Sequence, residues 1–315
     1  MSFEWIYIIL HITFYGILFV FALLGLYRRL QRDKGSVKLE DVTLIVPFRD
    51  EESTLPSLLK DLRKQEKLPK RFLFIDDHSS DEGSALVRNH LNEFELEVLG
   101  LPDDQFGKKK AIQFGVANVQ TKYCVTLDAD VDLDKDYFKS LELLEDADMW
   151  ILPVRMTGNS FFAQLASIDV TLSNILNRAF SVLRRPVLAS GANLLFKTES
   201  YRELSRTDHF DLLSGDDMFL LRDFREAGRD IRVTSDHRLT VSTETPGSMS
   251  EWLDQRVRWI SKAQRVGDIV PLFFALINFG MGVFFYLVLI LLSCSDLWTG
   301  MYLLLFKLFY DTLLM

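Results

Sequence analysis

Along the middle of the chain, segments with two different patterns of apolar and polar residues alternate. Short runs rich in apolar and β-branched residues predict strands at residues 42–48, 71–75, 95–99 and 123–127. Between them, apolar residues recur every three or four positions, which predicts helices at residues 53–65, 82–91 and 107–119. Strands and helices that alternate over short connections form βαβ units. We therefore expect an α/β fold with a mostly parallel sheet covered on both faces.

The pattern is looser after residue 130. A helix is expected to begin after Asp216 and Asp217 and to end near Gly228. The long amphipathic helix expected at residues 161–183 contains too many polar residues for a membrane span, so it either packs in the domain or lies on a membrane surface. The remaining runs predict a strand at residues 149–154 and edge strands at residues 231–233 and 239–241.

Both ends of the chain are strongly apolar. Residues 5–27 are long enough to cross a bilayer, and basic residues follow this run rather than precede it. This order favours a retained anchor over a signal peptide, and by the positive-inside rule it places the following domain in the cytoplasm. Two further spans are expected at residues 270–292 and 297–315. The helix before them, at residues 248–266, is aromatic and basic, which suits a membrane interface.

These segments divide the chain into four expected parts. They are an N-terminal transmembrane anchor at 1–34, a cytoplasmic catalytic domain at 35–247, an amphipathic interface helix at 248–268 and transmembrane helices at 269–315. A hydrophobic content of 48% beside 25% charged residues fits such a division, because the apolar excess lies at the ends.

Charge and cysteine content exclude several classes of protein. The net charge of -8 argues against a nucleic-acid-binding protein, which would need a basic face. The two cysteines, Cys124 and Cys294, are too few for a disulfide framework or a zinc cluster. No two of the five histidines have the spacing of metal ligands.

Acidic side chains stand where two of the predicted strands end. Asp76 and Asp77 end one strand, and Asp128 and Asp130 follow another. The carboxyl ends of parallel strands meet at one edge of a sheet, where ligands bind in open α/β folds. Residues two apart on a strand face the same way, so Asp128 and Asp130 can share a cation that relieves their repulsion. We expect a site here, and the alternative is a solvated acidic turn.

Lys108 follows Gly107 at the start of a predicted helix, which is a natural place to bind phosphate. The alternative is an exposed lysine face, because Lys109 and Lys110 come next. No Walker A or G-x-G-x-x-G motif is present, so a P-loop or a dinucleotide site is not supported.

Two later groups also allow two interpretations. Asp216 and Asp217 open a helix, where one carboxylate can cap the helix while the other acts as a general base. Gln255, Arg258 and Trp259 share one stretch of the interface helix. They either form a lid over a pyrophosphate and a sugar or anchor the helix at the membrane.

Taken in order, these motifs resemble those of the membrane-integrated family 2 glycosyltransferases. The matching segments and the family patterns are Val46–Glu51 (P-x-x-N-E), Ile75–Asp81 (D-D-G-S-x-D), Asp128–Asp130 (D-x-D), Gly215–Asp217 (E-D or G-D-D) and Gln255–Trp259 (Q-x-x-R-W). The chain departs from the patterns at Asp50, which replaces the usual asparagine, and at His78, which replaces the usual glycine.

The resemblance implies a GT-A fold, which is Rossmann-like with a mixed, mostly parallel sheet, and a nucleotide-diphosphate sugar bound with Mg²⁺ or Mn²⁺. It implies that Asp130 holds the metal and that Asp217 is the catalytic base. The residues implied in nucleotide-sugar binding are Pro47, Glu51, Asp76, Asp77, Lys108, Asp128 and Arg258. Those implied at the acceptor and lid are Asp216, Gln255 and Trp259.

We therefore expect an inverting glycosyltransferase that is integral to the cell membrane, with its catalytic domain in the cytoplasm. It would move a sugar from a nucleotide-diphosphate sugar, expected to be a UDP-sugar, to a lipid or lipid-linked acceptor. A processive polysaccharide synthase is the alternative enzyme, and two C-terminal spans make a thin channel for a polymer. The departures at Asp50 and His78 leave room for a catalytically inactive nucleotide-sugar-binding subunit, although Asp217 and Gln255–Trp259 are intact. A membrane nucleotidyltransferase would share the acids at strand ends but would leave the Q-x-x-R-W segment unexplained.

Overall fold

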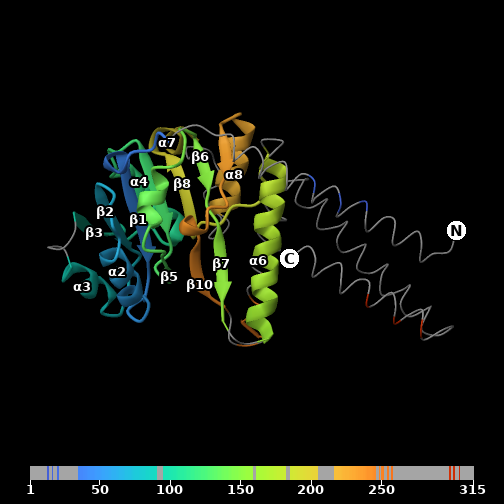
Figure 1. The fold of residues 1–315 in the computed structure, drawn as a ribbon. Helices are drawn as coiled ribbons and strands as arrows, with labels where there is room; N and C mark the ends of the chain where they lie inside the picture. Colours follow the sequence, from blue (N-terminus) through green and yellow to red (C-terminus); the bar gives the residue numbers. More distant parts are fainter. Residues whose placement is uncertain are drawn as a thin grey trace.

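The computed structural model describes residues 35–245 except 91–94, 159–160, 182–184 and 205–215, together with isolated positions nearer the two ends (13, 16, 20, 248, 250, 251, 254, 257, 298, 301 and 305). Its centre is a seven-stranded sheet in the order β3-β2-β1-β4-β8-β6-β9 (Figure 1). The strands are β1 Val42–Phe48, β2 Arg71–Asp76, β3 Leu96–Gly100, β4 Tyr123–Leu127, β6 Met149–Ile151, β8 Asn193–Lys197 and β9 Ile231–Val233.

The sheet is mixed and mostly parallel, as expected from the sequence. Neighbouring strands β3, β2, β1 and β4 run parallel, and so do β6 and β9. Only β8 runs antiparallel to its neighbours β4 and β6. In Figure 1 the arrowheads of β6 and β7 point downward, so the carboxyl ends of the strands that run parallel to β6 lie on the lower side.

A second sheet of three strands was not expected. It has the order β5-β10-β7, with β5 Val131–Asp132, β10 Val241–Glu244 and β7 Val154–Thr157. The single strand predicted at 149–154 is in fact two strands of different sheets, separated by Leu152 and Pro153. The edge strand predicted at 239–241 is also wrong, because Leu239 ends the short helix η2 (His237–Leu239) and β10 is the central strand of its sheet. Both errors arise because strand order depends on contacts between distant segments.

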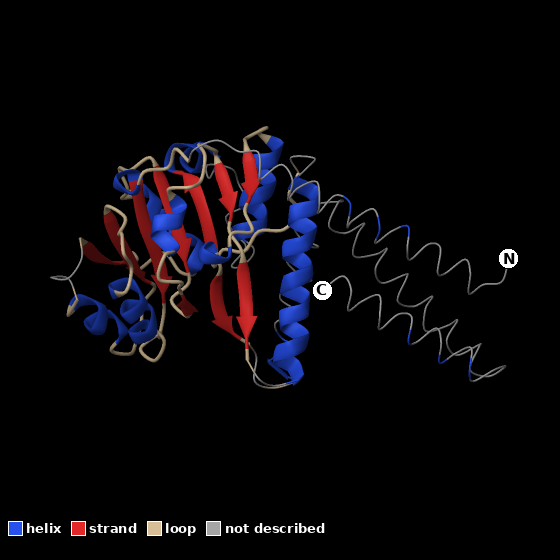
Figure 2. Cartoon of the chain, in the orientation of Figure 1, coloured by secondary structure: helices blue, strands red, loops and turns tan. Residues whose placement is uncertain are grey.

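Helices cover the large sheet on both faces (Figure 2). Besides η2, the helices of the described residues are η1 Leu39–Asp41, α2 Leu55–Arg63, α3 Gly83–Arg88, α4 Lys108–Ala117, α5 Tyr137–Leu141, α6 Phe161–Ser181, α7 Thr198–Leu204 and α8 Asp216–Glu226. The short helices α5 and α7 were not predicted, since five to seven residues carry too little periodicity to be recognised.

Alternate residues of β1 supply two separate hydrophobic cores. Leu44 packs in one core with Leu58 of α2, whereas Ile45 packs in the other with Ile112 of α4. All seven residues of β1 are buried. A strand that is buried on both faces is apolar throughout, which is why the sequence shows a continuous run here instead of alternation.

Helix α6 packs in the domain along β7 (Figure 1). Its residues Ala163 and Ala166 are buried, and the Asn174 side chain donates a hydrogen bond of 2.9 Å to the Val154 carbonyl of β7. The polar side chain of Asn174 therefore has a partner inside the domain.

Within the described part of the chain, no helix combines the length and the apolar character needed to cross a bilayer. The spans predicted at residues 5–27, 270–292 and 297–315 lie outside the described residues, apart from isolated positions, and so does most of the interface helix.

Candidate active site

A pocket of about 220 Å³ opens at the carboxyl edge of the large sheet. It is formed by the end of β1 and the turn after it, the end of β2, the start of α4 and the turn after β4. Six residues predicted from the sequence line it together: Pro47, Glu51, Asp77, Lys108, Asp128 and Asp130. The remaining lining residues are Phe48, Arg49 and Ala129. The structure thus brings together four sequence segments at the edge where the strand-end argument placed a site.

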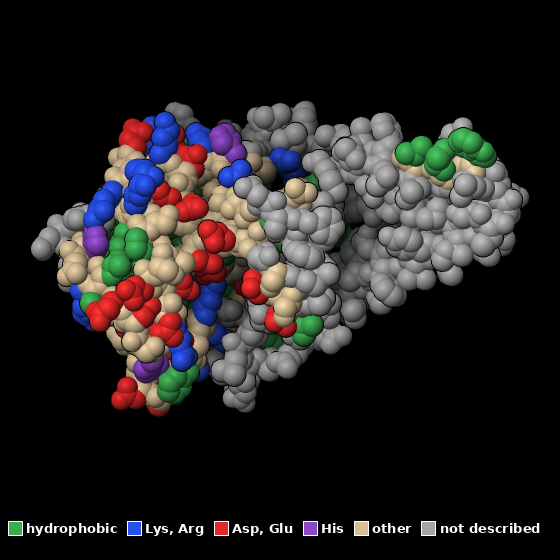
Figure 3. All heavy atoms as spheres, turned by 90° about the horizontal axis from the view of Figure 1, so that it is seen from below, with side chains coloured by type: hydrophobic (Ala, Val, Ile, Leu, Met, Phe, Trp, Pro, Cys, Tyr) green, Lys and Arg blue, Asp and Glu red, His purple; other side chains and the backbone are tan. Residues whose placement is uncertain are grey.

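Acidic side chains gather near the middle of the described surface when the molecule is viewed from below (Figure 3). This view looks toward the carboxyl ends of β1 and β4. A cleft with one sign of charge attracts the opposite charge, so this face suits a cation or a ligand that carries one.

Asp77 is held in place by the turn that precedes α4. The Gly107 N–H donates to Asp77 Oδ2 at 2.9 Å. Gly107 has φ 92° and ψ 155°, a conformation open essentially only to glycine, and this directs its N–H toward the carboxylate. Asp77 is 5% exposed, and its Oδ1 has no hydrogen-bond partner within the described residues. A buried carboxylate oxygen at the wall of a pocket is suited to accept a hydrogen bond from a ligand.

Asp76 has a different environment from its neighbour. Its Oδ1 accepts a hydrogen bond of 2.9 Å from the Ser79 N–H, and it does not line the pocket. This carboxylate stabilises the turn after β2.

Asp128 and Asp130 are unequal, although they are only two residues apart. Asp128 forms an ion pair with Lys108. Asp130 accepts a hydrogen bond of 3.2 Å from the Thr243 hydroxyl of β10. Partial desolvation raises the pKa of Asp130, and repulsion from Asp128 raises it further. Desolvation also raises the pKa of Glu51, and repulsion from Asp130 and Asp128 raises it further. The lining of the pocket contains four carboxylates but only two basic side chains, Arg49 and Lys108.

Asp217 lies at the start of α8, and it is linked to the edge of the pocket by Gly191, which also lies beside Lys108. Its Oδ1 accepts from the Met218 N–H at 2.8 Å, and its Oδ2 accepts from the Gly191 N–H at 3.1 Å. A Cβ atom on Gly191 would lie 3.4 Å from Lys108 Nζ and 3.6 Å from Asp217 Cβ. Asp217 and the Lys108–Asp128 pair therefore border the same glycine, although α8 follows α4 by about a hundred residues of sequence.

The two departures from the family patterns occupy unusual backbone positions. Asp50 has φ 53° and His78 has φ 59°, and they are the only described residues other than glycine with positive φ. Asparagine, aspartate and histidine are the residues that best tolerate this conformation after glycine. Both substitutions thus preserve the turn geometry, and Asp50 Oδ1 also accepts a hydrogen bond of 2.7 Å from the Ser80 N–H.

The predicted lid is not placed. Gln255, Arg258 and Trp259 lie outside the described residues, and only the backbone of Asp216 is described, as the first residue of α8. Their assigned roles stay predictions.

Two contacts of the site were not anticipated from the sequence. Thr243 is 113 residues from Asp130 and carries no motif that would mark it. Gly191 lies in the turn of small residues at 190–193, whose composition suggests close ligand approach, but the sequence does not show that its N–H faces Asp217.

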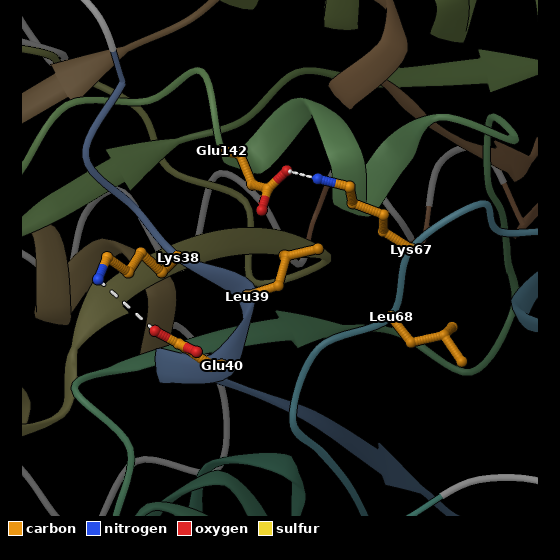
Figure 4. A pocket seen from close by; sticks show the side chains of 6 residues that line it. All are labelled: Lys38, Leu39, Glu40, Lys67, Leu68 and Glu142. Atoms are coloured by element: carbon orange, nitrogen blue, oxygen red, sulfur yellow. Dashed lines mark hydrogen bonds and ion pairs between the residues drawn. The ribbon is translucent and has the colours of Figure 1, made fainter.

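A larger pocket of about 410 Å³ lies near the amino ends of β1 and β2, at the edge opposite the candidate site (Figure 4). Its four charged side chains form two ion pairs, Lys67–Glu142 at 2.6 Å and Lys38–Glu40 at 3.6 Å. Leu39 and Leu68 complete the lining. Because its charges already satisfy one another, its size does not make it the better candidate for chemistry.

Comparison with known families agrees with the geometry. The family described as Glycosyl transferase family 2 matches residues 43–179, and Glycosyl transferase family group 2 matches residues 123–314, more than half of the chain. The chain belongs to glycosyl transferase family group 2. The matched ranges include the pocket, the turn at 190–193 and α8.

Relatives of this family group 2 chain include two named lipid-phosphate transferases. The undecaprenyl-phosphate 4-deoxy-4-formamido-L-arabinose transferase of Yersinia enterocolitica is 31% identical over 30% of this chain and 31% of its own length. The dolichyl-phosphate beta-glucosyltransferase of Dictyostelium discoideum is 25% identical over 54% of this chain and 58% of its own length. The chain thus spans from about a third to somewhat over half of these relatives.

Solved structures confirm the GT-A type of mixed α/β sheet. A mannosyltransferase from Pyrobaculum calidifontis in complex with GDP-Man and Mn²⁺ has a TM-score of 0.60 at 19% identity, and the match covers 85% of this chain and 76% of that one. A glucosyl-3-phosphoglycerate synthase from Mycobacterium tuberculosis, in complex with Mn²⁺, UDP-glucose and phosphoglyceric acid, has a TM-score of 0.51 at 17% identity. That match covers 75% of this chain and 86% of the other.

Proposed function

We propose that this chain is an inverting glycosyltransferase that moves a sugar from a nucleotide-diphosphate sugar to a lipid or lipid-linked acceptor. The observation that carries the proposal is the pocket at the carboxyl edge, where Asp77, Lys108, Asp128 and Asp130 meet and where Asp217 approaches from α8. Family membership and the two lipid-phosphate relatives support the same reaction class.

The nucleotide would bind between the ends of β1 and β2. The buried Asp77 Oδ1 lacks a partner within the described residues, so it can accept a hydrogen bond from an N–H group of the base. Uracil offers such a group at N3, and we propose a UDP-sugar as the donor from the resemblance of the sequence motifs. Pro47 and Glu51 line the same wall, whereas Asp76 would act by holding the turn that carries Asp77.

A divalent cation fits the residues of this pocket. Within the described part of the chain, no three His, Cys, Asp or Glu side chains form a complete metal site by themselves. Mg²⁺ typically binds through one or two carboxylates while substrate phosphates and water complete its shell, and Asp130 provides an oxygen ligand of that kind. A cation there would neutralise charge on the departing nucleoside diphosphate, and it would relieve the repulsion that raises the pKa of Asp130.

Asp217 would act as the general base. In an inverting transfer the bond between the anomeric carbon and the diphosphate oxygen breaks while the acceptor oxygen bonds to the opposite face of that carbon. An acceptor hydroxyl must lose its proton in this step, and the Asp217 carboxylate would receive it. The two backbone hydrogen bonds hold the carboxylate in one orientation.

The membrane parts of the proposal rest on sequence alone. We propose an anchor at 1–34, a cytoplasmic catalytic domain at 35–247, an interface helix at 248–268 and transmembrane helices at 269–315. In this arrangement Arg258 would meet the diphosphate, and Asp216, Gln255 and Trp259 would lie on the acceptor side of the lid. An acceptor that is a membrane lipid is consistent with such anchors.

The proposal is tested by incubating the membrane-embedded chain with a panel of nucleotide sugars, Mn²⁺ and either a polyprenyl phosphate or a lipid alcohol. Mass spectrometry of the lipid fraction should show one sugar added to the lipid. A ladder of products that carry many sugars would instead indicate a processive synthase. No transfer from any donor, with nucleotide-sugar binding retained, would indicate the inactive binding subunit.

In the same assay, Asp217→Asn should lower kcat by about 10²- to 10⁴-fold with a hydroxyl acceptor, because the general base is lost. Binding of UDP should be unchanged, since Asp217 would face the acceptor and is not among the residues that line the pocket. The matched control is Glu226→Gln, which removes an exposed carboxylate from the same helix and should leave kcat unchanged. The fall in kcat of Asp217→Asn should be smaller with a phosphate acceptor. Such an acceptor needs little help from a base, because it is already largely ionised above its second pKa of about 6. Wild-type turnover by Asp217→Asn with a hydroxyl acceptor contradicts the base assignment.

A further inference from the structure

The segment at residues 186–191 runs between helices α6 and α8 and ends beside Asp217. On its α6 side it is held by one buried side chain, Asn177, which is 4% exposed. The Asn177 Nδ2 donates to the Leu188 carbonyl at 2.6 Å. The Asn177 Oδ1 accepts from the Val187 N–H at 3.1 Å and from the Leu188 N–H at 2.8 Å. One amide thus pairs with backbone donors and an acceptor of two consecutive residues.

On its other side the segment contacts residues of α8. Arg225 donates to the Pro186 carbonyl at 3.4 Å, and the Ala189 N–H lies 3.4 Å from the Met218 sulfur. The Gly191 N–H then reaches Asp217 Oδ2 at 3.1 Å. Hydrogen bonds therefore join the segment to Asn177 of α6 on one side and to the first turn of α8 on the other.

A second buried amide holds the far end of the turn. Asn193 has no exposed surface, and its Oδ1 accepts from the Tyr137 hydroxyl at 2.6 Å. Its Nδ2 donates to the carbonyls of Pro153 and Leu239, each at 2.8 Å. Only residues 189–192 lie between the two anchored ends, so little backbone freedom remains at Gly191.

We propose that Asn177 is a positioning residue: it fixes segment 186–191 so that the Gly191 N–H holds the Asp217 carboxylate toward the pocket. This inference rests on the proposed function, because it takes Asp217 as the base. A base must lie within hydrogen-bond reach of the proton it removes, and a displacement of about 1 Å at a reacting group can reduce the rate about 10²-fold. Loss of the Asn177 contacts frees the segment and therefore spreads Asp217 over unproductive positions.

Helix α6 offers a matched control one turn earlier. Asn174 also donates through its amide to a backbone carbonyl, that of Val154 at 2.9 Å, but this carbonyl belongs to β7 and not to the segment. Asn174→Ala thus removes an amide from the same helix and a hydrogen bond to the backbone without loosening residues 186–191.

The experiment compares Asn177→Ala and Asn174→Ala in the full membrane-embedded chain. Amide hydrogen exchange is followed in peptides that cover residues 187–193, and kcat and KM are measured in the lipid assay. For Asn177→Ala we expect faster exchange at 187–191, kcat lower by about 10- to 100-fold and donor KM changed less than about twofold. For Asn174→Ala we expect wild-type exchange in these peptides and a wild-type kcat.

Unchanged exchange at 187–191 in Asn177→Ala overturns the inference, and so does faster exchange with a wild-type kcat. A fall in kcat with a matching rise in donor KM also overturns it, because it indicates general damage to the pocket. If Asn177→Ala does not fold, Asn177→Asp takes its place. That variant keeps an acceptor for the Val187 and Leu188 N–H groups but places an oxygen, which cannot donate, against the Leu188 carbonyl. Exchange at 187–191 should therefore be faster, and kcat lower, than in the wild-type chain.

The outcomes separate this inference from the proposed function. If the wild-type chain transfers no sugar from any donor, the proposed function fails. The exchange comparison then decides alone whether Asn177 holds the segment.

Discussion

Asp50 and His78, where the chain departs from the family patterns, show what a single residue must satisfy in a turn. Both have positive φ, which most side chains avoid, and both belong to residue types that tolerate it. The His78 ring also lies 4.7 Å from the Phe106 ring, and its Nε2 is 3.0 Å from the Gln105 carbonyl, so it ties the turn after β2 to the turn before α4. The departures therefore preserve the geometry of the turns beside the candidate site, and they do not by themselves favour an inactive subunit.

A carboxylate far from the pocket illustrates how one residue makes stability depend on pH. Asp146 lies 3.1 Å from Lys197 and 3.3 Å from Lys122, and it accepts a hydrogen bond from the Tyr123 hydroxyl. Desolvation works in the other direction, but these hydrogen bonds and charges lower the pKa of Asp146 to about 2. Because the folded-state pKa lies below the ordinary value of about 3.9, the stabilisation is complete above that value and is lost as the pH falls toward 2.

Asp146→Asn should therefore lower the free energy of unfolding at pH 7 by about 0.5–1 kcal/mol, a modest value because the side chain is 49% exposed and solvent screens it. Urea unfolding measured from pH 7 down to pH 3 should show the gap to wild type narrowing below pH 4. The control Glu40→Gln removes a more exposed pair with Lys38 and should change stability by less than about 0.5 kcal/mol throughout. A gap that stays constant with pH contradicts the assignment.

At the scale of elements, close packing of helix on sheet decides where the pocket residues stand. Helix α4 carries Lys108 at its first position and lies so near the sheet that Gly115 faces β1 directly. A Cβ atom on Gly115 would lie 2.9 Å from Ile45 Cγ2 and 3.3 Å from Ile75 Cγ1. The glycine thus allows the approach that brings Lys108 to Asp128.

Gly115→Ala tests this packing. Alanine is the better helix former by about 1 kcal/mol, but the contact with Ile45 forces the helix away from the sheet, and overpacking of this kind costs about 1–3 kcal/mol. We expect a net loss of stability in thermal or urea unfolding. The control Gly100→Ala places a methyl group where nothing lies within 4 Å and should change stability by less than about 0.5 kcal/mol. A stabilised Gly115→Ala variant would contradict the close approach.

At the scale of the whole molecule, the candidate site joins segments that span most of the described domain. The ends of β1, β2 and β4 supply the pocket wall, the start of α4 supplies Lys108, and the first turn of α8 supplies Asp217. The small sheet contributes as well, since Thr243 of β10 holds Asp130. A ligand that fills the pocket therefore binds only the folded state of the domain, and its binding should stabilise the whole unit.

UDP and Mn²⁺ together should raise the thermal unfolding temperature, since a ligand at 100 times its Kd adds about 2.7 kcal/mol to the folded state. EDTA should remove most of this rise in unfolding temperature and abolish sugar transfer to the acceptor. In Asp130→Asn, the rise in unfolding temperature that depends on Mn²⁺ should be lost. In Asp132→Asn this rise should persist, because Asp132 belongs to β5 and accepts a hydrogen bond of 2.9 Å from Ser57. An equal shift in EDTA, or in Asp130→Asn, would contradict the metal assignment.

The sequence by itself determined the local elements of the first half and most of the pocket. Strands β2 and β4 are apolar runs with a buried middle, and acidic residues stand at or directly after their ends. These signals lie within a few consecutive residues, so they can be read without knowledge of the fold. Tertiary structure alone decided the second sheet and the antiparallel direction of β8. It also decided the unequal environments of Asp76 and Asp77, and the hydrogen bonds between Asn177 and the segment beside Asp217. These features depend on pairings between residues far apart in the chain, and side-chain periodicity carries no information about which distant partner each strand or amide will meet.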